Sequence, residues 1–357
     1  MKWPAAYLRH PWSLETVSER GTLPFVILTR TVDREAVDAA IPQDKAGHYD
    51  HSILHRRDRR FQQWLDCFVV PAGRHCRFTN DDKGHAALVA RLADEDGFCV
   101  LEATGLYDRA LCRSLHEAGR SFHRANPRKA RQFARSAGFL AKTDRVDAVM
   151  LARYGAAMAL PAEERCEPER ERLRELVDRR DQLVEMRKGE RIRLAQPHDD
   201  WLEESLVQVI AMFDGQIAAL EARMEALLAS VRHLAAQKAI LCSAPGVGAV
   251  TAGVLLAHLP ELGRRDRRAI GALAGLAPIA RDSGTLRGRR CIWGGRKRVR
   301  DALYMAALAA CRSGPFKAVS KAMRDKGKPA KLVVIAIARR LLVALNAAIR
   351  DNKPFHT

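Results

Sequence analysis

The sequence predicts an α/β unit over residues 63–160, a long helical segment over 161–237 and a mostly α-helical C-terminal domain over 238–357. Three observations support this division. Two apolar runs are followed by alternating strand and helix signals, which is typical of an α/β sheet. Apolar residues then recur at helical spacing within a heavily charged stretch. In the last third, Gly-rich interruptions separate apolar helical patterns.

In the α/β unit, residues 65–70 and 74–79 have the patterns of two strands joined by a turn at Gly73. Asn80-Asp81 then provides a cap for the first helix. The elements expected after it are a strand at 98–101, a helix at 107–118, a strand at 121–125, and helices at 127–136 and 143–158.

Residues 1–62 show no comparable pattern. Four prolines interrupt every candidate helix there, and residues 55–60 form a charge run without periodicity. We therefore expect an irregular segment.

The helical segment is divided into two long helices by Gln196-Pro197-His198. Two such helices form either an antiparallel pair or an intermolecular coiled coil. We expect a spacer that also dimerises.

The charge of the chain is concentrated at one end. Of its 61 Lys and Arg residues, 24 lie in 238–357 together with 6 of the 42 acidic residues, which leaves 37 basic and 36 acidic residues in the first 237. A compact basic region indicates a polyanionic partner, most simply nucleic acid.

Several other classes of protein are excluded. The longest apolar run near the N-terminus, Leu23–Leu28, is too short for a membrane span or a secretory signal. The eight cysteines form no CxxC motif and no Cys/His cluster, so they are expected to be reduced core residues. We therefore expect a cytoplasmic protein without a membrane partner.

Three acids are candidate metal ligands. Glu102 follows an apolar strand, at the end of a sheet where ligands gather. Asp144 and Asp147 share one helix face, where two like charges repel unless a cation lies between them. Alone, Glu102 is more often explained as a helix cap or a surface residue, and the aspartate pair is equally explained by a solvated first turn. Together they favour Mg²⁺ (or Mn²⁺), since this cation prefers oxygen ligands.

Two Gly-rich segments are candidate DNA contacts. Gly246 and Gly248 lie in a Pro-Gly-Val-Gly turn that is either the hairpin of a helix-hairpin-helix element or a plain packing corner. Residues 281–300 contain eight Lys or Arg and one acid. Ser283 lies in this basic stretch, although a loop serine is ordinarily a turn former. The basic candidates are Arg287, Arg289, Arg290, Arg296, Lys297, Arg298 and Arg300.

Taken together, these motifs resemble one family. Val100–Tyr107, Asn126-Pro127-Arg128 and Lys142–Tyr154 are similar to the N-terminal domain of the Piv-type, DEDD-class insertion-sequence transposases. Ser243–Gly248, Gly275–Pro278, Asp282-Ser283-Gly284 and Gly294-Gly295-Arg296 resemble their C-terminal domain. The resemblance covers about residues 64–355 in a consistent order.

The resemblance implies an RNase H-like (RuvC-like) nuclease fold whose four acids bind a divalent metal. Glu102, Asp144 and Asp147 would be the second, third and fourth acids, and Ser283 would form a covalent phosphoserine link to a DNA end. It also implies a homodimer or homotetramer on DNA and, in some members, a structured guide RNA.

One position departs from the family pattern. The family's first acid lies on the first strand, seven residues before the Asp of a Leu-Asp pair. Here that pair is Leu65-Asp66, and the corresponding position holds Arg59. Asp58 is adjacent but would point to the opposite face of a strand. Asp66 is a poorly placed substitute.

The genetic code offers an explanation for this departure. The codons GGG-ATC-GAC-GTT-TCC encode Gly-Ile-Asp-Val-Ser, and read two bases later they give Asp-Arg-Arg-Phe, the residues at 58–61. We hypothesise that residues 1 to about 62 are translated out of frame. The sheet should then lack its central strand, and a three-acid site should cleave little or no DNA.

Three functions therefore compete. The first is a DNA transposase/recombinase that cuts and rejoins element ends by metal-assisted phosphoryl transfer with a serine nucleophile. The second is a structure-specific RuvC-like endonuclease that uses the acids alone. The third is a non-catalytic nucleic-acid-binding remnant.

Overall fold

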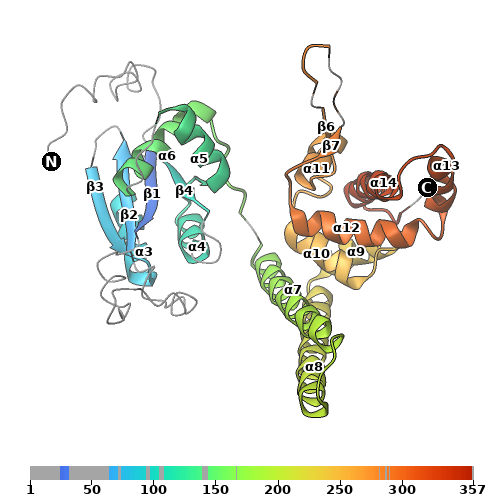
Figure 1. Ribbon diagram of the computed structural model, residues 1–357. Coiled ribbons are helices and arrows are strands. Elements are labelled where there is room, and N and C mark those ends of the chain that lie inside the picture. The colour runs from blue at the N-terminus through green and yellow to red at the C-terminus, as the bar shows by residue number, and fades with distance from the viewer. Residues whose placement is uncertain are drawn as a thin grey trace. The chain divides into compact units, whose positions relative to one another are not determined.

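The computed structural model describes most of the chain beyond residue 63 and one strand before it. The described residues are 25–31, 64–70, 74–93, 97–103, 108–138, 144–165, 167–280, 282–285, 288 and 290–355. They form two compact units, which divide between Arg165 and Cys166 (Figure 1).

The first unit contains a five-stranded mixed sheet. Its strands are β1 (Phe25–Thr31), β2 (Trp64–Val70), β3 (Arg74–Thr79), β4 (Phe98–Glu102) and β5 (Phe122–Ala125), in the spatial order β3-β2-β1-β4-β5. β1, β2 and β3 are antiparallel neighbours, whereas β4 runs parallel to β1 and β5 runs parallel to β4.

Helices cover both faces of this sheet. The helices are α3 (Asp82–Leu92), α4 (Arg109–Glu117), α5 (Pro127–Ser136) and α6 (Asp144–Met158). α3 and α4 pack on the face that carries Leu65, Cys67 and Leu101. α5 and α6 pack on the opposite face, against Phe68 and Val100. The expected α/β unit is thus confirmed, with side chains alternating between the two faces as strand geometry requires.

The expectation that the sheet lacks its central strand was wrong. β1 lies in the centre, between β2 and β4, and comes from the segment we expected to be irregular. Its sequence, Phe-Val-Ile-Leu-Thr-Arg-Thr, is rich in residues that favour strands. The rest of residues 1–62 lies outside the described part of the chain.

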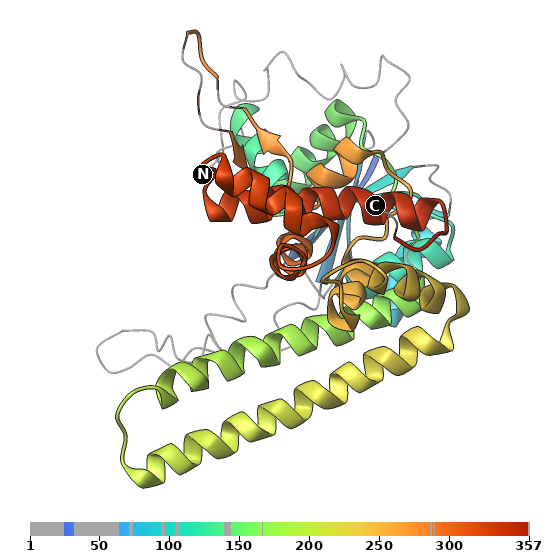
Figure 2. The ribbon, with the colours of Figure 1, turned by 90° about the vertical axis from the view of Figure 1, so that its right-hand side faces the viewer.

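The second unit begins with a long helical hairpin. α7 (Pro168–Leu194) and α8 (Asp200–Ser230) run side by side in opposite directions, as Figure 2 shows. The antiparallel pair is therefore present within one chain. At its base, Leu173, Val177, Met224 and Leu228 belong to the same apolar core as the C-terminal helices. The hairpin is thus continuous with the C-terminal core.

The remaining helices build a bundle around α14 (Ala330–Arg350). The others are α9 (Arg232–Cys242), α10 (Ala249–His258), α11 (Arg267–Leu273), α12 (Lys297–Ala310) and α13 (Pro315–Asp325). Ile337, Leu341, Leu342 and Leu345 of α14 are fully buried and contact the neighbouring helices. Burying several such side chains, each worth about 1.5–3 kcal/mol, is the main stabilising contribution here.

Two helices, α8 and α14, are long and apolar enough to span a membrane by length and composition. The core position of α14 accounts for its composition, because half of its most apolar window is buried inside the unit. α8 is apolar along the side that faces α7, where Phe213 and Ile217 pack against Leu183.

A thin arm projects from this bundle. β6 (Pro278–Ile279) and β7 (Cys291–Ile292) pair in antiparallel fashion at its base, between α11 and α12 (Figure 1). The arm carries the Gly/Arg-rich stretch of the sequence.

Candidate functional site

The candidate acids of the first unit lie on two elements that pack together, strand β4 and helix α6. Glu102 ends β4 and is partly buried, and α6, which begins at Asp144, packs against β4. Asp147 is also partly buried, whereas the side chain of Asp144 is outside the described part of the structure. Glu102 lies two residues beyond Val100, so it points to the face covered by α5 and α6.

Strand register identifies the residue of β1 that lies between Asp66 of β2 and Glu102 of β4. Asp66 of β2 pairs with Thr29 of β1. Leu28 pairs with Leu101 in the parallel β1–β4 ladder, so Thr29 stands level with Glu102. Paired residues in neighbouring strands point to the same face. The backbone positions that lie level across the three strands are therefore those of Asp66, Thr29 and Glu102, and the residue at the middle position is not an acid.

Asp66 forms an ion pair with Arg77. Only 1% of its surface is exposed, and its Oδ1 accepts a hydrogen bond from Nε of Arg77 at 2.9 Å. A buried carboxylate requires such a partner. This ion pair joins β2 to β3.

The described side chains do not fit a complete metal site. Among them, no three His, Cys, Asp or Glu residues lie close enough together to hold a metal ion. Glu102 and Asp147 have the oxygen donors that Mg²⁺ prefers. Thr29, at the middle position between Asp66 and Glu102, supplies no carboxylate, so the negative charge that would hold a divalent cation is incomplete.

Ser283 lies on the arm of the second unit and is exposed. Beside it, Gly284 has φ 54°, and Oδ1 of Asp282 accepts a hydrogen bond from the Gly288 amide at 3.1 Å. Arg290 is exposed on the same arm, while Arg287 and Arg289 lie outside the described residues. A serine here is open to a large substrate.

Two glycines in direct contact fix the base of the arm. Gly275 has φ 69° and Gly295 has φ 64°. A Cβ on Gly295 would lie 2.1 Å from the amide nitrogen of Gly275, and a Cβ on Gly275 would lie 2.3 Å from the carbonyl oxygen of Gly294. Only glycine satisfies both the left-handed conformation and the close approach.

Three of the predicted DNA-binding residues have partners at this base. Arg296 binds both carboxylate oxygens of Glu261, at 2.5 and 2.6 Å, and also donates to the His258 carbonyl oxygen. Arg300 donates to the Gly294 carbonyl oxygen at 2.7 Å, and Lys297 pairs with an acid one turn along α12. Burial raises the pKa of Glu261, but the hydrogen bond and charge of Arg296 outweigh this and lower it overall.

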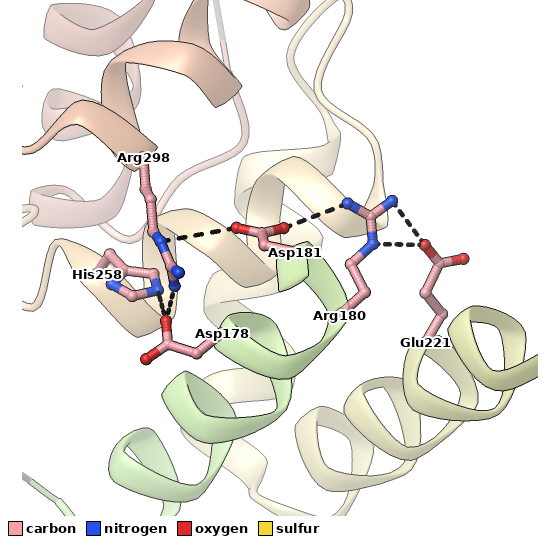
Figure 3. Close-up of polar contacts among 6 residues, drawn as sticks. All are labelled: Asp178, Arg180, Asp181, Glu221, His258 and Arg298. Atoms are coloured by element: carbon pink, nitrogen blue, oxygen red, sulfur yellow. Dashed lines mark hydrogen bonds and ion pairs between the residues drawn. The ribbon is translucent and has the colours of Figure 1, made fainter. Parts of the chain in front are cut away.

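Arg298 belongs to a chain of charged contacts that crosses four helices (Figure 3). It pairs with Asp178 of α7, which also contacts Nε2 of His258 at 3.1 Å, and its Nε lies 3.9 Å from Asp181. Asp181 lies 3.4 Å from Arg180, which in turn contacts Glu221 of α8 at 2.9 Å. The network therefore connects the start of α12 to the helical hairpin.

The Pro-Gly-Val-Gly turn is explained by packing at one position. Gly246 has φ 79°, and a Cβ there would lie 2.2 Å from the carbonyl oxygen of Ala306. Gly248 caps α10 and faces open space. Packing alone thus accounts for Gly246, the packing-corner alternative, whereas Gly248 remains accessible.

Sequence reasoning did not identify the acids that bind these arginines. Glu261 and Asp178 are far from their partners in the sequence, and neither lies in a motif. The one available signal was for Glu261, one of six acids in the basic last third of the chain.

Comparison with known proteins assigns two parts of the chain to one family. Residues 71–197 match the DEDD transposase domain of IS110-type elements, and residues 238–321 match the transposase IS116/IS110/IS902 family. This chain belongs to the IS110-type DEDD transposases. It is thus a DNA transposase/recombinase, and its DEDD domain implies a RuvC-like fold.

Two relatives extend over most of the chain, and a third matches less than half of it. The pilin gene-inverting proteins of Moraxella bovis and Moraxella lacunata are each 29% identical over 300 residues, which is 81% of this chain and 93% of the relative. The 43.6 kDa protein of insertion element IS110 from Streptomyces coelicolor is 31% identical over 156 residues, which is 43% of this chain and 38% of that protein. DEDD transposases generally use divalent metals and bind DNA.

Proposed function

We propose that this transposase joins its own Ser283 to a DNA end and then passes that end to a second strand. The observation that supports this most directly is the place of Ser283, exposed on an arm whose base is fixed by glycine contacts and by Arg296. A nucleophile on an arm with a fixed base can reach a phosphate of the DNA backbone while the rest of the unit stays in place.

The proposed reaction needs no reactant other than the protein and the DNA. The hydroxyl oxygen of Ser283 attacks the scissile phosphorus, and a P–O bond of the DNA strand breaks as the new bond forms. The serine proton passes to the departing oxygen, which becomes a free hydroxyl. Basic residues on the arm, Arg290 among them, stabilise the charge that develops on the phosphate oxygens. Attack by a hydroxyl of another DNA end then reverses the link and joins the strands.

Glu102, Asp144 and Asp147 are the proposed metal ligands. A bound Mg²⁺ or Mn²⁺ would stabilise negative charge on a phosphate. With Thr29 at the middle position between Asp66 and Glu102, the chain is expected to hold this cation weakly and to cleave slowly.

Self-association and a guide are proposed for the assembly. The hairpin exposes large apolar side chains at Trp201, Val207 and Met212, which supports a homodimer or homotetramer. Family membership suggests a structured RNA from the element as a guide. The relatives that invert pilin genes suggest that inversion of a DNA segment is within the same chemistry.

One experiment distinguishes the competing functions. The full chain and Ser283→Ala are incubated with the native element ends, with and without the flanking transcript, and cleavage, joining and covalent adduct are each measured. The proposal predicts an adduct and joined product that Ser283→Ala loses.

Two results would contradict the proposal. Cleavage that is retained in Ser283→Ala would identify an endonuclease that uses the acids alone. Salt-sensitive binding with neither cleavage nor adduct would identify a non-catalytic remnant, an alternative that the neutral Thr29 favours.

A further inference from the structure

Helix α5 presents a row of arginines on the surface of the first unit. Asn126 caps the helix through hydrogen bonds from the amides of residues 128 and 129, and Pro127 occupies the first turn. Ala130 and Ala134 are buried against α6 and the sheet. Phe133 contacts the ring of Tyr154, with centroids 5.4 Å apart. The helix is therefore held rigidly by its apolar side.

The opposite side of α5 is exposed and basic. Arg128, Arg131 and Arg135 lie at positions i, i+3 and i+7, which share one face of a helix. Lys129 is also exposed but projects from a different side, since adjacent residues do not face the same way. The helix contains no acidic residue.

Within the described residues, none of these four side chains forms an ion pair. Other basic residues of the unit are paired: Arg124 binds Asp108 at 2.8 Å, and Arg77 binds Asp66. An unneutralised row of guanidinium groups has a strong preference for an anionic partner.

The row starts beside the candidate acids. Glu102 pairs with Ala125 in the β4–β5 ladder, and α5 begins two residues after Ala125. α5 also packs against α6, the helix of Asp144 and Asp147 (Figure 1). The row of arginines therefore starts near the carboxyl end of β4, where Glu102 lies.

We infer that Arg128, Arg131 and Arg135 bind the phosphate backbone of duplex DNA and guide it to the acids of the first unit. This inference rests on the proposed function. From residue 128 to 135 the helix rises about 10 Å, which corresponds to roughly three base pairs measured along the axis of B-DNA. Among the described residues of this face there is no exposed aromatic side chain on which an unpaired base would stack. Backbone contact with a duplex fits such a surface best.

The test compares substitutions that change charge equally on the same helix. Arg128→Gln, Arg131→Gln, Arg135→Gln and the control Lys129→Gln each remove one positive charge, and glutamine keeps helix propensity close to that of arginine or lysine. Binding of the full-length variants to a fluorescent DNA duplex of mixed sequence is followed by anisotropy over a range of salt concentrations. Circular dichroism checks that each variant is folded.

We expect each arginine variant to flatten the slope of log K against log salt by about 0.9, and Lys129→Gln to leave it unchanged. Equal effects of Lys129→Gln and the arginine variants, or no effect of any, would overturn the inference. An effect that appears only with an RNA duplex would also overturn it and would assign the surface to RNA.

These outcomes are distinct from failure of the proposed function. If the wild-type chain forms its Ser283 adduct while the arginine variants bind DNA normally, only the inference about α5 fails. If the wild-type chain does not bind DNA in any salt, the proposed function fails as well.

Discussion

Gly275 and Gly295 meet backbone to backbone at the root of the arm that bears Ser283. A Cβ on Gly295 would lie 2.1 Å from the Gly275 amide nitrogen, so no side chain fits there. This contact, together with the Arg296–Glu261 pair, determines where the arm leaves the bundle. The base of the arm that carries the serine is therefore fixed by close packing and an ion pair.

Gly295→Ala should displace the arm while the bundle stays folded. The left-handed conformation costs about 1–2 kcal/mol with a side chain, and the clash with Gly275 adds to that. We expect a lower thermal unfolding midpoint and loss of the Ser283 adduct. The control is Gly215→Ala, a mid-helix position with open space, which should raise the midpoint slightly. Normal adduct formation by Gly295→Ala would show that the contact does not position the arm.

Acid should weaken the second unit through Glu261. Arg296 lowers the pKa of Glu261 below the unfolded value of about 4.5 despite its burial. Its contribution to stability is therefore fully present above that pH and is lost as the pH falls through the lower, folded pKa. Thermal unfolding between about pH 6 and 3 should show a smaller loss for Glu261→Gln. The two proteins should converge at the acidic end, and parallel curves would refute the role of this carboxylate.

Thr29→Asp should strengthen metal binding in the first unit. Its register places the new carboxylate level with Asp66 and Glu102. The crowded acids should destabilise the metal-free protein and bind Mg²⁺ or Mn²⁺ more tightly, so the unfolding midpoint should rise with added metal. Thr31→Asp, two residues further along the same face, is the matched control. Equal metal effects in both variants would argue against Thr29 as the position of the missing acid.

The reading frame of the first segment is testable at the DNA level. β1 occupies the centre of the sheet, so the out-of-frame hypothesis rests on the codon coincidence at residues 58–61 and on Arg59, which stands where the family pattern has its first acid. We expect codons at these positions that give Gly-Ile-Asp-Val in another frame. Codons that give it in no frame would end the hypothesis.

Much of the α/β unit followed from local patterns. The apolar strand 98–101 and the helix beginning with Asn126-Pro127 have strong signals, and the structure has β4 and α5 there. β1 was missed because its apolar run, Phe25–Leu28, lies among prolines and charges, and pairing with β2 and β4 stabilises it. Tertiary pairing of this kind is not visible in a window of sequence.

The candidate sites were only partly predictable, for a similar reason. Composition placed the positive charge in the last third, yet two arginines there form ion pairs: Arg296 with Glu261, and Arg298 with Asp178. The arginines of α5, which form no ion pair within the described part of the chain, lie in a region whose overall charge is close to zero. A count of charges does not show which ones are neutralised, because ion pairs join residues that are distant in sequence.

The most direct test of the account is to identify the atom that becomes linked to DNA. Wild-type protein and Thr29→Asp are incubated with the native element ends and Mn²⁺, digested, and examined by mass spectrometry for a nucleotide-bearing peptide. The account predicts a phosphoserine link at Ser283, scarce in the wild type and more abundant in Thr29→Asp. A link at another residue, or no link in either protein while the DNA is cut, would contradict it.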